Sequence, residues 1–278
     1  MKKIKIVADS SCDIFELKHV EFETAPLKVI TADREFIDDA SLDIDDMVDY
    51  LYRLKGKSKS SCPNTADWMN TFGDADEIYC VTITSGLSGS YNSACAAKQI
   101  YESENEGKRV HVFDSLSAGP EITLIIEKIE ECIGNGMSFE EVCESVTAYK
   151  KNTGLVFMLK SLKNFANNGR VSPLVAKLVG IAGICIVGKA SDEGTLEPLH
   201  KPRGENHALK TLLNSLISEG YNGGKVSIGH CRNEAAAKQL KELITSKFAN
   251  AQIDIHKFRG LCSFYAEKGG ILVGFEKA

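Results

Sequence analysis

The sequence predicts an α/β protein made of two α/β domains, with mostly parallel sheets and a ligand site between the domains. Two patterns carry this prediction. Short apolar runs alternate with amphipathic segments of helical spacing, and the alternation starts again near residue 153. Repeated strand–loop–helix units are typical of parallel strands covered by helices. The composition agrees, because 43% hydrophobic and 26% charged residues in a chain of 278 residues are typical of a globular protein.

The first predicted domain covers residues 1–152, and its strands each lead through a polar loop into a helix. Asp43 is a predicted N-cap for the first helix, because apolar residues recur at helical spacing behind it. Ser138 and Glu141 form a predicted capping box for the last helix. The predicted strands are residues 4–8, 77–83 and 109–113, and the predicted helices cover 44–54, 65–72, the stretch from 90 to 100, the segment after 119, and 138–151.

The second predicted domain covers residues 153–278 and repeats the same unit. A long amphipathic helix follows the loop 229–233, and the chain closes on an apolar run before its last residues. The predicted strands are residues 155–158, 184–187, 225–228, 253–255 and 271–275. We therefore expect two sheets, one in each domain.

Charge and cysteine content argue against several classes of protein. The 33 Lys and Arg residues are scattered and face 38 Asp and Glu, for a net charge of −5, whereas nucleic-acid-binding domains concentrate basic residues on one face. No stretch approaches the roughly 18 consecutive apolar residues of a membrane span, so we expect no stable membrane insertion. Residues 1–7 lack the features of a secretion signal. Nine cysteines without a CxxC pair predict reduced thiols, a cytoplasmic location and no metal site.

Three loops that follow predicted strands are rich in hydroxyl groups. They are Asp9-Ser10-Ser11, Thr84-Ser85-Gly86 and Asp114-Ser115-Leu116-Ser117. Loops at the carboxyl ends of parallel strands share one sheet edge, where the N-termini of helices favour an anion. The alternative is that each serine only caps a helix or forms a turn. Together with Ser60-Ser61, these loops favour an anion-binding site.

The segment Thr82-Ile83-Thr84-Ser85-Gly86-Leu87-Ser88-Gly89-Ser90-Tyr91-Asn92-Ser93-Ala94 closely resembles the signature of the DegV family of bacterial fatty-acid-binding proteins. The resemblance extends along the whole chain. Further matches, in the family's order, are Asp9-Ser10-Ser11-Cys12-Asp13, Ser60-Ser61-Cys62-Pro63-Asn64, Asp114-Ser115 with Ser117-Ala118-Gly119, Leu162-Lys163-Asn164 and Gly169-Arg170-Val171-Ser172.

This resemblance implies non-catalytic binding of one long-chain fatty acid between two α/β domains. Ser61 and Ser85 would be direct ligands of the carboxylate, supported by Ser60 and Thr84, with Gly86 in the same loop. The acyl chain would lie in an apolar tunnel, where each buried methylene contributes about 0.8 kcal/mol. The resemblance implies no cofactor beyond this ligand. Its implied partner is a separate fatty acid kinase, which makes an acyl phosphate for phospholipid synthesis.

Two positions leave the site open to more than one interpretation. The resemblance implies that Arg170 completes the polar network, and the alternative is a cation that bonds loop carbonyls after Asn167-Asn168-Gly169. Tyr265 stands where the family has a histidine, and its phenol can donate a hydrogen bond but does not titrate near neutral pH. The family's Lys-Pro pair is absent, with Ala182-Gly183 near that position. These departures concern the carboxylate geometry and the kinase partner.

Two other function classes compete with the fatty acid carrier. A serine hydrolase acting on acyl esters would use a Gly-x-Ser-x-Gly elbow, but in Gly86-Leu87-Ser88-Gly89-Ser90 the second glycine comes one position early. A phosphosugar- or nucleotide-binding protein could use the same loops, although the sequence has neither GxGxxG nor GxxxxGK[ST].

Overall fold

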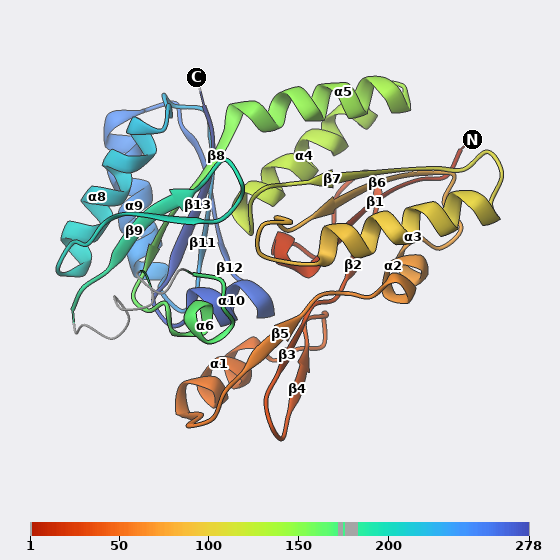
Figure 1. Ribbon diagram of the computed structural model, residues 1–278. Helices are drawn as coiled ribbons and strands as arrows, with labels where there is room; N and C mark the ends of the chain where they lie inside the picture. Colours follow the sequence, from red (N-terminus) through yellow and green to blue (C-terminus); the bar gives the residue numbers. More distant parts are fainter. Residues whose placement is uncertain (1, 172–174, 176–182, 278) are drawn as a thin grey trace.

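The computed structural model describes residues 2–171, 175 and 183–277 (Figure 1). Ser172 of the matched motifs and Ala182, near the absent Lys-Pro pair, lie outside these residues. The described strands form three sheets. The N-terminal sheet has the order β2 (Glu21–Ala25), β1 (Ile4–Asp9), β6 (Glu77–Thr82), β7 (Arg109–Asp114). The C-terminal sheet has the order β10 (Leu196–His200), β9 (Ile186–Ala190), β8 (Thr153–Leu159), β13 (Ile271–Glu276), β11 (Lys225–His230), β12 (Gln252–Lys257). A small sheet has the order β4 (Glu35–Ile37), β3 (Lys28–Ile30), β5 (Lys59–Ser61).

The N-terminal sheet is parallel throughout, as predicted. Its central strands are buried on both faces, because alternate residues pack against helices on opposite sides. Val7 and Ile78 pack toward α2 (Thr65–Phe72) and α3 (Ser90–Glu104), whereas Ile6 and Tyr79 pack toward α4 (Pro120–Gly134) and α5 (Phe139–Tyr149). Both predicted caps are present, since Asp43 accepts a hydrogen bond at the start of α1 (Ile44–Arg53) and Ser138 forms a capping box at the start of α5.

The C-terminal sheet is mixed, and the expectation of mostly parallel strands is wrong for it. Only β11 and β12 are parallel, because the final strand β13 enters between β8 and β11 antiparallel to both, and β9 forms a hairpin with β10. A buried strand reads as the same apolar run in either direction, so the sequence pattern does not specify this. The α/β class itself is confirmed.

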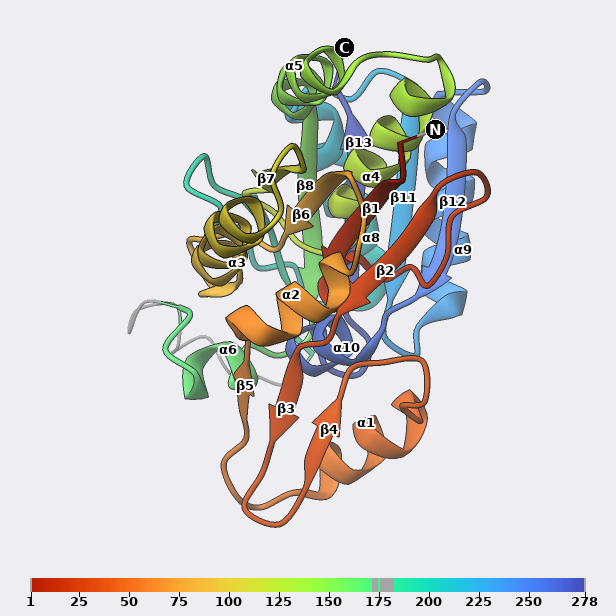
Figure 2. The same cartoon turned by 90° about the vertical axis from the view of Figure 1, so that its right-hand side faces the viewer.

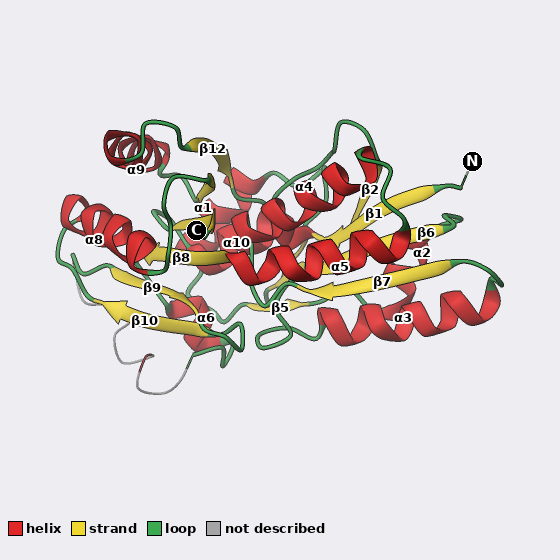
Figure 3. Cartoon of the chain, turned by 90° about the horizontal axis from the view of Figure 1, so that it is seen from above, coloured by secondary structure: helices red, strands yellow, loops and turns green. Residues whose placement is uncertain are grey.

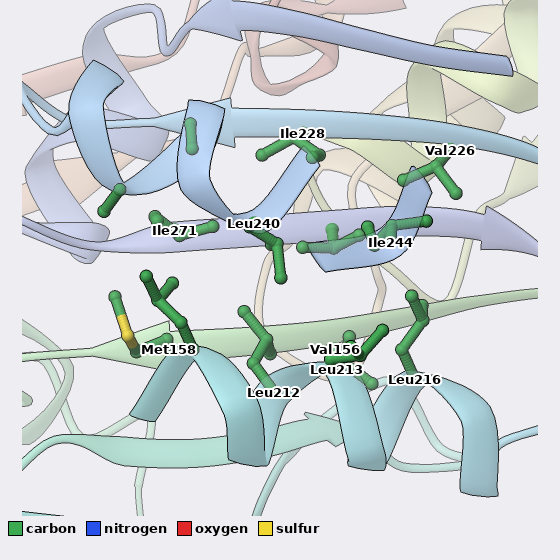
Figure 4. Packing of buried hydrophobic residues seen from close by; sticks show 14 of the residues in the cluster. Val156, Met158, Leu212, Leu213, Leu216, Val226, Ile228, Leu240, Ile244 and Ile271 are labelled. Carbon is green, nitrogen blue, oxygen red and sulfur yellow. The ribbon is translucent and has the colours of Figure 1, made fainter. Parts of the chain in front are cut away.

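One face of the C-terminal sheet carries a large hydrophobic core. Figure 4 shows Val156, Met158 and Ile228 of the sheet interdigitating with leucines of α8 (Glu205–Ser218) and with Leu240 of α9 (Glu234–Lys247). Burying each such side chain contributes about 1.5–3 kcal/mol. Helices α8 and α9 therefore cover one face of the C-terminal sheet, and its other face is turned toward the N-terminal half of the chain (Figure 3).

Helix α4 lies between the two large sheets and contacts strands of both (Figure 2). Its first seven residues are all buried. The helix approaches β13 at Gly274, where an added Cβ would lie 2.4 Å from the backbone nitrogen of Glu121. A glycine is therefore needed at this point for the two layers to touch.

The small sheet and α1 project from the N-terminal half but pack against the other half of the chain (Figure 1). Their contact is α10 (Gly260–Ala266), whose first two N–H groups donate to the Asp38 carboxylate at 2.8 Å each. The fully buried Arg259 donates to the Asp38 carbonyl at 2.7 Å. No strand was predicted between the helices 44–54 and 65–72, but the structure has β5 there, and this packing supports it. The remaining described helices are the 3₁₀ turns Ser10–Cys12 and Lys150–Asn152 and the short α6 (Lys163–Asn167).

Across the part of the chain that the structure describes, no helix combines the length and apolar character needed to cross a membrane.

Candidate functional site

A cavity of about 240 Å³ lies between the two large sheets and is lined by residues from both sides of residue 153. One part of its wall is polar, and seven hydroxyl-bearing side chains line the cavity. These are Ser60, Ser61, Thr84, Ser88, Ser117, Thr195 and Tyr265. Two cations, Arg170 and Lys189, also line the cavity. The larger apolar side chains of the wall come from the inner face of the C-terminal sheet, including Leu155, Phe157, Leu159, Leu196 and Leu272.

Thr84 is held at the polar wall by hydrogen bonds from the loops around it. Its backbone N–H donates to the Ser117 carbonyl at 2.8 Å, and its Oγ1 accepts the Gly86 N–H at 3.1 Å. Next to Thr84 in the chain, the Ile83 N–H donates to the buried Asp9 carboxylate at 2.9 Å, and the Ser90 hydroxyl donates to the same carboxylate at 2.6 Å. Burial raises the pKa of Asp9, and these donors act against that rise. Asp9 thereby joins the ends of β1 and β6 to the start of α3.

The N-terminus of α3 faces the same polar wall. Its cap position is Gly89, which lines the cavity and provides no side-chain hydrogen bond to the first turn. A helix N-terminus carries a partial positive charge and unpaired N–H groups, both of which favour an anion. The helix has 15 residues, so this polarity is fully developed at the cavity.

Ser60 and Tyr265 meet across the cavity wall. Their hydroxyl groups lie 2.7 Å apart, although the two residues are 205 positions apart in the sequence. The Tyr265 ring packs between Phe165 and Phe264, with centroid distances of 4.6 and 4.8 Å. Burial raises the pKa of Tyr265, while the Ser60 hydrogen bond and the Arg170 charge lower it. The phenol therefore stays protonated around neutral pH and can donate.

Arg170 lines the cavity but uses its guanidinium on backbone carbonyls. Its Nε donates to the Leu87 carbonyl at 3.2 Å, and its Nη1 donates to the Asn168 carbonyl. Asn168 in turn accepts from the Ser60 N–H at 3.3 Å and donates to the Ser58 carbonyl at 3.2 Å. These contacts match the alternative interpretation, in which Arg170 bonds loop carbonyls. They also join β5 to the loop that follows Thr84.

Ser85 and Gly86, both expected at the carboxylate, are not among the described residues that line this cavity. Ser85 is exposed, and its backbone N–H donates to the Asp114 carboxylate at 3.0 Å. Thr84 accepts the N–H groups of Leu87 and Ser88 in the following turn. This tight turn directs Thr84 and Ser88 into the cavity and leaves the Ser85 side chain toward solvent. The sequence motif shows which residues are in the loop but not which way each one points.

The wall also contains residues that the sequence did not assign as ligands, Ser117 of a predicted hydroxyl loop and Gly194. Ser117 is 2% exposed, and its Oγ has no hydrogen-bond partner in the described part of the chain. Gly194, in the turn between β9 and β10, approaches so closely that an added Cβ would lie 2.0 Å from Thr84 Oγ1. The hydroxyl-rich loop that contains Ser117 indicated this residue from the sequence. The sequence could not indicate Gly194, because its contact with Thr84 joins residues 110 positions apart.

Among the described residues, no three His, Cys, Asp or Glu side chains come together as a metal-binding group. The cavity lining contains no histidine among the described residues either. One lining residue, Cys262, neighbours the buried Asp13. Burial raises the pKa of the Asp13 carboxyl to about 8 and raises that of the neighbouring Cys262 thiol.

Comparison with known proteins identifies the family. Residues 3–278 match the family described as "uncharacterised protein, DegV family". The chain belongs to the DegV family. A DegV domain-containing protein of Streptococcus pneumoniae is 45% identical over 276 residues, which cover 98% of each chain. The resemblance seen in the sequence motifs is therefore confirmed for the whole chain.

Solved structures of DegV proteins share the fold closely. A DegV family protein from Eubacterium eligens, loaded with heptadecanoic acid, is 44% identical, with a TM-score of 0.96 over 99% of this chain and all of that one. The Streptococcus pneumoniae Fatty Acid Kinase (Fak) B3 protein, loaded with linoleic acid, is 45% identical, with a TM-score of 0.97 over the same shares. A DegV family protein from Ruminococcus gnavus, refined with vaccenic acid, is 33% identical, with a TM-score of 0.90 over 99% of this chain and all of that one.

Proposed function

We propose that this DegV protein binds one long-chain fatty acid as a carrier and does not act on it chemically. The observation that carries the proposal is the cavity, whose wall is polar at hydroxyl groups and apolar along the C-terminal sheet. A fatty acid has the same two parts. The similarity to DegV proteins loaded with heptadecanoic and linoleic acid supports this ligand class.

The energetics of the cavity suit this ligand. Each buried methylene contributes about 0.8 kcal/mol, so the apolar wall supplies most of the affinity. The carboxylate must then receive hydrogen bonds, because a buried anion without partners is costly. Thr84 and Ser61 are the proposed donors, close to the N-terminus of α3. Ser60, Tyr265 and Arg170 are proposed to hold these donors in position, and Ser85 is proposed to act only through its backbone.

The proposed partner is a separate fatty acid kinase, to which the protein presents the bound carboxylate for acyl phosphate formation. The support is its 45% identity to the Fatty Acid Kinase (Fak) B3 protein over nearly the whole chain. Binding through hydroxyl and N–H donors leaves a carboxylate free to react. All nine cysteines are free, which supports a proposed location in a reducing compartment such as the cytoplasm.

We also propose that the two halves meet near residue 153, where a 3₁₀ turn precedes β8. The ligand is then held between the halves, since both line the cavity. The halves are not independent of each other, because Phe36 and Met47 of the small sheet and α1 pack in one cluster with Phe258 and Phe264.

A titration with palmitic acid tests this function. We expect saturable binding of one fatty acid per protein molecule, measured by isothermal titration calorimetry. A chromogenic acyl ester serves as the matched test for the hydrolase alternative, and we expect no sustained turnover. Ester turnover that is lost on changing Ser88 to Ala would contradict the carrier function, as would the absence of palmitate binding.

A further inference from the structure

Phe157 and Gly188 form a cross-strand pair in the apolar wall of the cavity. They are directly opposite each other in the antiparallel pair of β8 and β9. Phe157 lines the cavity and is 3% exposed. A Cβ built on Gly188 would lie 2.5 Å from Cζ and 2.9 Å from Cε2 of the Phe157 ring. The ring therefore occupies the space that any side chain at position 188 would need, and it can lie against β9 only because that residue is a glycine.

The position of this ring decides how wide the cavity is at its apolar wall. Leu155 and Leu159, which flank Phe157 along β8, line the same cavity, so the ring stands in the middle of the wall. Protein interiors are closely packed, so a ring displaced from β9 has only the cavity to move into. A smaller side chain at position 157 would instead widen the cavity at this point.

We propose that the Phe157–Gly188 pair determines which acyl chains this protein accepts. The inference rests on the proposed function, since it concerns the selectivity of the same cavity. When the Phe157 ring lies against Gly188, the cavity has a fixed width beside the ring. This width discriminates between an extended saturated chain and a chain bent by a cis double bond. One methylene more or less in a hydrophobic pocket changes discrimination by roughly 10- to 200-fold. A change in ring position is expected to act on this scale.

The test compares the affinities of palmitic and oleic acid in competition with a fluorescent fatty acid. We expect Phe157→Leu to raise the ratio of oleic to palmitic affinity by about tenfold, because the added width accommodates the bent chain. Phe275→Leu is the matched control. Phe275 is fully buried in the hydrophobic core on the other face of the C-terminal sheet and does not line the cavity. It should leave the ratio unchanged.

Gly188→Ala is expected to shift the same ratio in the opposite direction, because the added methyl pushes the ring into the cavity. An added Cβ would also lie 2.3 Å from the Glu197 carbonyl oxygen, so thermal unfolding must first show that this variant folds. Phe157→Leu does not depend on that result. An unchanged ratio in folded Phe157→Leu, or an equal shift in Phe275→Leu, would overturn the inference while leaving fatty acid binding intact. Failure of the wild-type protein to bind either acid would overturn the proposed function itself.

Discussion

Removing the Thr84 hydroxyl should weaken fatty acid binding while the fold survives. Thr84 is 1% exposed and lines the polar wall, and Thr84→Val keeps its shape but removes the proposed donor to the carboxylate. Hydrogen bonds to charged groups contribute roughly 1.5–3 kcal/mol, so affinity should fall about ten- to a hundredfold. The change also frees the Gly86 N–H, but Gly86 is exposed and water can replace the lost acceptor.

The assay is competition between a fluorescent fatty acid and either palmitic acid or the corresponding long-chain alcohol. The alcohol carries no charge, so its affinity should respond much less to Thr84→Val. Ser85→Ala is the matched control from the same loop, and we expect a change of less than about twofold, because this side chain lies outside the cavity. Equal losses for acid and alcohol in Thr84→Val would mean that Thr84 does not donate to the carboxylate. A large loss in Ser85→Ala would restore Ser85 as the ligand in place of Thr84.

Three further predictions follow from other parts of the structure. Tyr265→Phe keeps the ring packing but removes the 2.7 Å hydrogen bond between the Tyr265 and Ser60 hydroxyl groups. The binding free energy of palmitate should weaken by about 1 kcal/mol. An unchanged palmitate affinity would mean that the ring only lines the cavity. Burial raises the pKa of Asp13 to about 8, against about 3.9 for an unfolded aspartate, so the wild-type protein should lose unfolding free energy as pH rises through this window. In Asp13→Asn this loss should be smaller, by up to about 1.4 kcal/mol per pH unit, and identical urea-unfolding profiles would contradict the buried, protonated carboxyl. Residues 1–152 expressed alone should bind a fluorescent fatty acid poorly, because the cavity loses its apolar wall, and tight binding by this fragment would contradict a site between the halves.

The sequence predicts three of the four strands of the N-terminal sheet but misses β2 and the small sheet, which lie in the same half of the chain. The strands that became β1, β6 and β7, and both predicted caps, follow from local apolar runs and capping residues. The small sheet was missed because its three-residue strands are stabilised by α10, which lies some 200 residues away in the chain. The direction of β13 was missed for a related reason, since strand polarity depends on where a segment pairs and not on its composition.

In the candidate site too, the sequence predicts what depends on residues close together in the chain and misses what depends on contacts between distant segments. The motifs predicted the hydroxyl loops, and the structure brings Ser60, Ser61, Thr84, Arg170 and Tyr265 to one cavity. They could not tell Thr84 from Ser85, because adjacent residues of a turn point in different directions. The approach of Gly194 to Thr84 and the seating of Phe157 on Gly188 depend on contacts across the fold, so no sequence pattern within one segment reveals them.

Mass spectrometry of the protein purified from bacterial cells shows whether it carries a fatty acid. Under native conditions, we expect a mass that exceeds that of the chain by one fatty acid. Under denaturing conditions, we expect the bare chain and a released long-chain fatty acid in equal amounts. A bare chain mass under native conditions, even after incubation with palmitic and oleic acid, would mean that the protein is not a fatty acid carrier.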